Sequence, residues 1–169
     1  MGNVLLFGRP LSGAPRAGGG WDWRRGGMKH GSTVMSKMQG TMVAIVTPFK
    51  DGGVDRDKFA GLCERQVKAG VEAIVPTGTT GESATLTHEE HHEVIVACVE
   101  NVKGRAKVYA GAGSNSTDEA VDLTRFAEKA GCDGTLHVSP YYNKPSDEGI
   151  YRHLEAVAKA SPLPVIIYN

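Results

Sequence analysis

The stretch AIVPTGTTGE, residues 73–82, joins a short apolar run to a turn made of glycine and threonine. A nearly continuous apolar run is typical of a parallel strand that is buried on both faces. A capping box that begins at Thr87 predicts a helix soon afterwards. The turn therefore lies at the carboxyl end of a strand, where α/β folds bind their ligands. Its glycines let the backbone approach a small anion, and the hydroxyls of Thr79 and Thr80 can bind a carboxylate or pass protons.

The same strand-and-helix pattern repeats along the chain. Short apolar runs predict five strands that begin near Met42, Ala73, Val108, Thr135 and Pro164. Amphipathic segments predict four helices between them, with N-caps at Asp55, Thr87, Ser116 and Ser146. The run from Ser116 to Glu119 is predicted to form a second capping box. Strands spaced by about 30 residues match the βα repeat of an eight-fold barrel.

The length of the repeating region favours a partial barrel over an open sheet, although five βα units fit either. Residues 39–169 amount to about half of a ~250-residue barrel. The chain also stops at Asn169, directly after an apolar strand whose edge we expect to be unpaired. We therefore expect an α/β domain at residues 39–169 that comprises the first five strands and four helices of a TIM (β/α)8 barrel, truncated to its amino-terminal part.

Residues 1–38 differ in composition from the rest of the chain. They contain six Arg and Lys residues against one acidic residue, Asp22, and they are rich in glycine. We predict that residues 1–38 are a disordered leader that is non-native, wrongly assigned or a targeting peptide. An Arg-rich, acid-poor stretch is compatible with an organelle transit peptide. The expected compartment is therefore the cytoplasm, or an organelle stroma if the leader acts as a transit peptide.

Overall composition excludes several classes of function. Nineteen basic and nineteen acidic residues give a net charge of zero, so no basic surface for nucleic acid is expected. No apolar run approaches the roughly 18 residues of a membrane-spanning helix. The three cysteines form no CxxC pair, which favours buried thiols in a reducing compartment over a disulfide framework.

Four motifs resemble those of the 4-hydroxy-tetrahydrodipicolinate synthase family, also called dihydrodipicolinate synthases. They are AIVTPF at 44–49, GTTGESATL at 78–86, PYYNKP at 140–145 and YN at 168–169. The resemblance extends over residues 40–169. It implies a lyase of lysine and diaminopimelate biosynthesis that condenses pyruvate with aspartate 4-semialdehyde through a Schiff base. It also implies a homotetramer, built as a dimer of dimers, without a cofactor.

The resemblance assigns roles to residues of the threonine turn and to two tyrosines. Thr79 matches the threonine of the proton relay, and Tyr168 matches the tyrosine that exchanges protons beside the Schiff base. Tyr142 matches the tyrosine that reaches into the neighbouring subunit's site. Thr80, with the backbone N–H groups of Thr79 and Thr80, matches the cradle for the pyruvate carboxylate. Without the family, the threonines are equally typical of turn capping, and Tyr168 of an aromatic residue in a core strand.

In the family the lysine that forms the Schiff base lies one βα unit beyond the position of Asn169. The arginine that binds the semialdehyde carboxylate also lies beyond it. Lys50 and Lys144 are expected in loops without the dry surroundings that lower the pKa of an amine. We therefore expect this chain to be inactive by itself.

A second group of residues matches the site that binds the feedback inhibitor lysine in regulated members of the family. The matching residues are Ser83, Ala84, His88, His91, Asn115, Glu119 and Tyr141. A polar subunit interface without regulation explains the same residues.

Two further motifs predict no functional site. HEEHH at 88–92 has the spacing of a zinc-peptidase motif, but its first histidine falls in the first helical turn and no further ligand follows, so no metal is predicted. GAGSNS at 111–116 lacks the third glycine of a dinucleotide fingerprint and predicts a tight turn. Alternatives that stay open are another pyruvate-dependent lyase, resembling N-acetylneuraminate lyase, and a binding module without catalysis.

Overall fold

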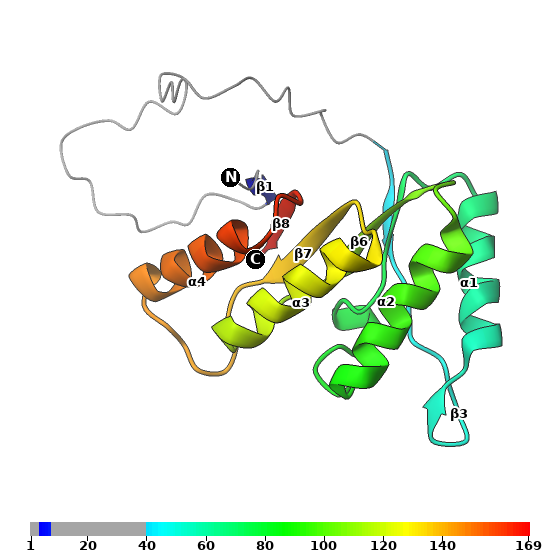
Figure 1. The fold of residues 1–169 in the computed structure, drawn as a ribbon, viewed down its shortest axis with the longest axis horizontal. Coiled ribbons are helices and arrows are strands. Elements are labelled where there is room, and N and C mark those ends of the chain that lie inside the picture. Colours follow the sequence, from blue (N-terminus) through cyan, green and yellow to red (C-terminus); the bar gives the residue numbers. More distant parts are fainter. Residues whose placement is uncertain (1–3, 8–39) are drawn as a thin grey trace.

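The computed structural model describes residues 4–7 and 40–169, and its main feature is a row of five parallel strands (Figure 1). They are β2 (Met42–Ala44), β5 (Ala73–Val75), β6 (Lys107–Gly111), β7 (Gly134–Val138) and β8 (Val165–Tyr168). Each pairs in parallel with the next along the chain, in the order β2-β5-β6-β7-β8. This half-barrel confirms the fold predicted from the βα repeat. Because the strands are parallel, their five carboxyl ends lie along the same side of the sheet.

Four helices connect these strands and lie along one side of them (Figure 1). They are α1 (Arg56–Lys68), α2 (His88–Val102), α3 (Thr117–Ala130) and α4 (Asp147–Ala160). The four predicted N-caps are confirmed: the side chain of each cap accepts a backbone N–H from the first turn of its helix. At Thr87 the capping box is complete, because the carboxylate of Glu90 also accepts the N–H of Thr87 at 2.9 Å.

The capping box predicted for Ser116 and Glu119 was half wrong. The Ser116 hydroxyl does accept the backbone N–H of Glu119. The Glu119 carboxylate, however, accepts the hydroxyl of Ser114 and lies near the ring of His88 instead of returning to the cap. A second hydroxyl and an imidazole compete for this carboxylate, and both belong to the functional site described below.

Four short elements were not predicted. The antiparallel strands β3 (Phe49–Lys50) and β4 (Gly53–Val54) form a hairpin before α1, and Thr79–Gly81 form a 3₁₀ turn, η1. The strand β1 (Val4–Phe7) pairs in parallel with β8. The edge of β8 that was expected to be unpaired is therefore covered, and the reason is that part of the leader supplies a strand. The other leader residues, 1–3 and 8–38, lie outside the described residues.

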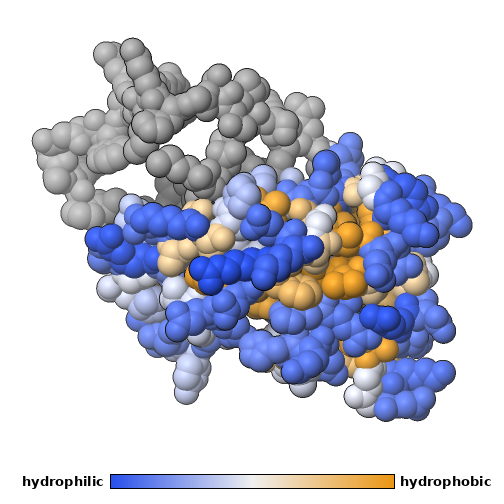
Figure 2. All heavy atoms as spheres, viewed as in Figure 1, coloured by the Kyte–Doolittle hydropathy of each residue, from blue (hydrophilic) through white to orange (hydrophobic). Residues whose placement is uncertain are grey.

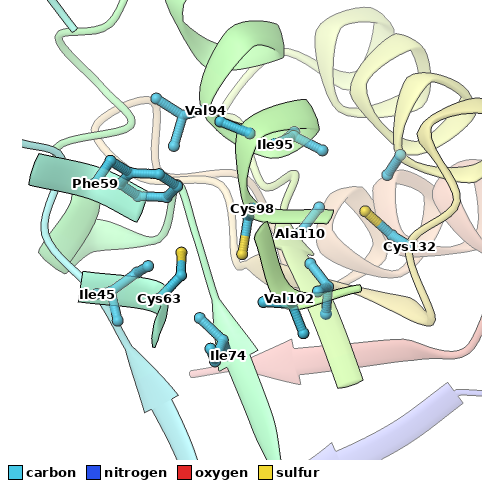
Figure 3. Close-up of a cluster of buried hydrophobic side chains, with 13 residues drawn as sticks. Ile45, Phe59, Cys63, Ile74, Val94, Ile95, Cys98, Val102, Ala110 and Cys132 are labelled. Carbon is cyan, nitrogen blue, oxygen red and sulfur yellow. The ribbon is translucent and has the colours of Figure 1, made fainter. Parts of the chain in front are cut away.

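The largest hydrophobic core lies between the strands and helices α1 to α3 (Figure 3). Phe59, Ile74, Val94 and Ile95 are fully buried in it. The thiols Cys63 and Cys98 are buried in the same cluster, and Figure 3 shows their sulfurs turned toward one another. Polar and charged residues cover most of the face seen in Figure 2, with apolar side chains visible between them. Within the described part of the chain, no helix is long and apolar enough to cross a membrane.

Candidate active site and adjacent polar pocket

The threonine turn, residues 78–82, follows β5 after an interval of two residues, Pro76 and Thr77. Gly78 has an extended backbone, and its carbonyl oxygen accepts the N–H of Gly81 at 2.9 Å. Glu82 closes the turn with a left-handed backbone, at φ 62°, and donates its N–H to the Thr79 carbonyl. Thr79 and Thr80 are exposed at the carboxyl end of the sheet. Their side chains are thus accessible from outside the chain.

Thr79 and Tyr168 line the same small cavity, although they come from different βα units. Tyr168 is the last residue of β8 and its side chain is 53% exposed. The other lining residues come from the ends of β5, β6 and β7 and the turns after them: Thr77, Gly78, Ser83, Gly111, Gly113, Leu136 and Val138. Thr80, the neighbour of Thr79 in the sequence, does not line this cavity. A threonine hydroxyl and a phenol thus share one cavity, a pairing suited to proton transfer.

Tyr142 lines neither this small cavity nor the second pocket described below. It lies in the loop between β7 and α4, and its side chain is 92% exposed. Its backbone is left-handed, at φ 69°, a conformation that is uncommon for a bulky residue. Next to it, Tyr141 lines the second pocket. The loop therefore presents one tyrosine to its own chain and the other to the outside.

The second pocket, called the polar pocket below, is larger, with a volume of about 340 Å³, and it is lined mostly by polar residues. Six of the seven residues predicted for lysine binding line it: Ser83, Ala84, His91, Asn115, Glu119 and Tyr141. The seventh, His88, lies just outside, with its Nδ1 atom 3.7 Å from Oε1 of Glu119. Ser83 lines both cavities, so the two sites are direct neighbours.

Glu119 is the acidic group of this pocket. Its Oε2 atom accepts a hydrogen bond from the Ser114 hydroxyl, and Ser114 is itself buried. The Ser114 oxygen also accepts the backbone N–H of Ser116 at 3.0 Å. This arrangement holds the carboxylate at the wall of the pocket, where it can pair with a cationic group. Sequence reasoning missed Ser114, whose only signal was its place in the turn after β6.

The three histidines at the start of α2 have different partners. His91 is buried, which lowers its pKa, and its Nε2 atom lies 2.8 Å from the Gly111 carbonyl oxygen. His92 stacks on Phe126 of α3 with ring centroids 3.7 Å apart. His88 faces Glu119. Because the rings turn to separate partners, they do not form a shared set of metal ligands.

The pocket also contains residues that the sequence did not single out. They are Leu86, Gly113, Ser114 and Leu123. In the smaller cavity, Thr77 was missed because it lies before the recognised motif. Lys50 and Lys144 are exposed and line neither cavity.

Comparison with known proteins relates this site to one family. The sequence model of the dihydrodipicolinate synthetase family matches residues 37–169. A 4-hydroxy-tetrahydrodipicolinate synthase from Nitratidesulfovibrio vulgaris is 56% identical over 133 residues, which are 79% of this chain and 46% of that protein. One from Phenylobacterium zucineum is 54% identical over 131 residues, 78% of this chain and 45% of that protein. The chain thus spans about half the length of the curated relatives that it matches.

Solved structures agree. The 4-hydroxy-tetrahydrodipicolinate synthase of Methylacidiphilum fumariolicum superposes with a TM-score of 0.77 and 52% identity, over 79% of this chain and 44% of that one. The enzyme from Cyanidioschyzon merolae, solved with lysine bound, superposes with a TM-score of 0.74 and 45% identity, over 77% of this chain and 45% of that one. The family predicted from the GTTGES and YYNKP motifs is therefore confirmed. The chain belongs to the dihydrodipicolinate synthetase family.

Proposed function

We propose that this chain supplies the proton relay and the carboxylate-binding turn of an enzyme that condenses pyruvate with aspartate 4-semialdehyde. The product would be 4-hydroxy-tetrahydrodipicolinate, a precursor of lysine and diaminopimelate. The observation that carries this proposal is that Thr79 and Tyr168 line one cavity, although 89 residues separate them. The sequence identity of this chain to known 4-hydroxy-tetrahydrodipicolinate synthases supports the proposal.

The chemistry requires an anchor for pyruvate and a path for protons. The Thr80 hydroxyl and the N–H groups at the start of η1 are proposed to bind the pyruvate carboxylate, because the first N–H groups of a helical turn have no partner within it. The Thr79 hydroxyl, beside the Tyr168 phenol, then passes protons to and from the imine and the enamine that follows. A phenol needs such a partner because its ordinary pKa is near 10.

The amine that forms the imine is proposed to come from a longer form of the protein. Among residues 40–169, no lysine lines either cavity. We therefore propose that the 169 residues alone do not complete the catalytic group. The relay is proposed to be completed by Tyr142 of a neighbouring subunit, because Tyr142 projects away from its own chain. This exchange requires at least a dimer, and we propose the dimer of dimers that the family resemblance implies.

The polar pocket is proposed to bind lysine as a feedback inhibitor. Glu119 would pair with an ammonium group, and Asn115 and the imidazoles would supply hydrogen bonds. The lysine-bound relative from Cyanidioschyzon merolae supports this ligand. The free cysteines of the core support a reducing compartment, with the cytoplasm as the simplest choice.

Trapping with pyruvate and borohydride tests the proposal. Reduction fixes an imine as a stable adduct, which mass spectrometry locates. We expect the 169-residue chain to stay unmodified, and a chain extended to the length of the curated relatives to gain one adduct on one lysine. In the extended chain, Thr79→Val should slow adduct formation, while Thr85→Val, a change in the adjacent turn, should not. An extended chain that forms no adduct would contradict the proposed function.

A further inference from the structure

Thr77 has a backbone conformation that its side chain disfavours. Its φ is 52°, in the left-handed region, where a β-branched residue is an outlier. Only 1% of the residue is exposed, and it lines the small cavity directly before Gly78 and Thr79. Strained residues of this kind persist only where their surroundings hold them, and they are frequent at functional sites.

The surroundings that hold Thr77 belong to the end of β6. The Thr77 hydroxyl lies 3.0 Å from the Gly111 carbonyl oxygen and 2.8 Å from the Pro76 carbonyl oxygen. In return, the N–H of Gly111 donates to the Pro76 oxygen at 2.9 Å. A Cβ atom at position 111 would collide with the Thr77 carbonyl group, so only glycine permits this close approach. The hydroxyl has a single proton, which the two carbonyl oxygens share or exchange.

The Gly111 carbonyl oxygen has a second donor, which comes from the polar pocket. His91 Nε2 lies 2.8 Å from it, and because a carbonyl can only accept, this nitrogen carries the proton. Burial lowers the pKa of His91, which favours the neutral ring. His91 lines the polar pocket, and Thr77 lines the small cavity. One oxygen atom therefore accepts one donor from each cavity.

We propose that Thr77 is a positioning residue for the threonine turn, and that the Gly111 carbonyl couples this turn to the polar pocket. When His91 donates its proton fully to Gly111, the Thr77 hydroxyl is shared with Pro76. When a ligand in the polar pocket draws the His91 N–H away, the Gly111 oxygen is left to the Thr77 hydroxyl, which shifts toward it. The backbone of residues 78–82 continues directly from Thr77 and follows that shift. The consequence for catalysis rests on the proposed function, whereas the coupling itself does not.

Amide hydrogen exchange of the chain, measured by NMR, tests the coupling without substrate or inhibitor. The reporters are the amides of Gly81 and Glu82, which donate to carbonyl oxygens within the turn. We expect Thr77→Val and His91→Phe each to speed their exchange about fivefold, as expected for the loss of one hydrogen bond. The double variant should show clearly less than the product of the two effects, because both changes act on the same oxygen. Thr77→Ser keeps the hydroxyl, so the Gly81 and Glu82 amides should exchange at the rates of the unsubstituted protein.

Thr124→Val is the matched control. Thr124 is as buried as Thr77, and its hydroxyl also donates to a carbonyl oxygen, that of Ala120, but it has no bond to the turn. This change should leave the exchange of Gly81 and Glu82 unaltered. If Thr77→Val is too unstable to study, Thr77→Ala takes its place. The NMR chemical shift of the His91 Nε2 proton gives a second measurement. It should change in Thr77→Val and Thr77→Ala but not in Thr124→Val.

Two results would overturn the proposal. One is that the effects of the Thr77 and His91 changes multiply in the double variant, which means that the two side chains act independently. The other is that Thr77→Ser exchanges as fast as Thr77→Val, which assigns the effect to packing. Failure to trap a pyruvate adduct would overturn the proposed function alone and leave this coupling standing.

Discussion

The hydroxyl of Thr47 donates a hydrogen bond of 2.8 Å to the carbonyl oxygen of Gly81, although 34 residues separate them. Thr47 follows β2 and is buried, and Gly81 ends the turn that carries Thr79. The two groups meet because β2 and β5 are neighbours in the sheet. This bond attaches the threonine turn to the adjacent strand from the side opposite to β6.

Replacing Thr47 with valine should therefore destabilise the protein. The change keeps the shape of the side chain but leaves the buried Gly81 oxygen without this donor. The expected loss is about 1–3 kcal/mol in the free energy of unfolding, measured by urea denaturation. Thr85→Val is the control, because the Thr85 hydroxyl bonds Glu82 at an exposed position and its loss should have little effect. Equal losses in the two variants would contradict the importance of the Thr47 bond.

Acid should destabilise the layer between β7 and the helices α3 and α4. Burial, together with the nearby His153, lowers the pKa of His137 to about 3, and burial lowers the pKa of His153. The unfolded chain binds a proton near pH 6.5, so the free energy of unfolding falls as the pH falls below that value. One such group contributes a slope of about 1 kcal/mol per pH unit between pH 6 and pH 4.

His137→Gln should lower the slope by the contribution of that one group, about 1 kcal/mol per pH unit, because glutamine does not titrate in this range. The measurement is urea denaturation at several pH values. The unsubstituted protein, measured at the same pH values, is the reference. An unaltered slope in the His137 variant would show that other groups cause the acid sensitivity.

The three thiols should be unreactive in the folded protein. Cys63, Cys98 and Cys132 are all buried and free. A hydrogen bond to Cys63, together with burial, raises the pKa of Cys98, and burial raises the pKa of Cys132 to about 12. The same hydrogen bond from Cys98 lowers the pKa of Cys63, so that thiol is protected by its burial and not by its pKa. Since the thiolate is the reactive form, reaction with a chromogenic disulfide reagent should be roughly a hundredfold or more slower than in denaturant. Fast labelling of any one thiol without denaturant would contradict this burial.

Removing the charge of Glu119 should weaken lysine binding. If the carboxylate pairs with the ammonium group, Glu119→Gln should lower the affinity by at least about tenfold, measured by calorimetry. Glu128→Gln, on an exposed position of the same helix, should leave the affinity unchanged. Equal affinity in the two variants would mean that the pocket does not bind lysine through Glu119.

Much of the fold could be predicted because it depends on local patterns. Apolar runs predicted the five parallel strands, and single hydroxyl or carboxylate side chains predicted all four N-caps. The capping box at Ser116 was half wrong because Glu119 found partners in Ser114 and His88, which no local rule could rank against the cap. The strand β1 was missed because its partner, β8, lies at the other end of the chain.

Local sequence is enough to tell which residue types follow each strand, and it places Thr79 and Tyr168 at the carboxyl ends of β5 and β8. Three further relationships depend on the packing of the whole fold: Thr79 and Tyr168 line one cavity, Ser83 lines two, and Thr77 and His91 share one acceptor. The reason is that strand order is local information, whereas the distance between strand ends depends on the curvature of the sheet. That curvature results from packing the whole core, which no short motif encodes.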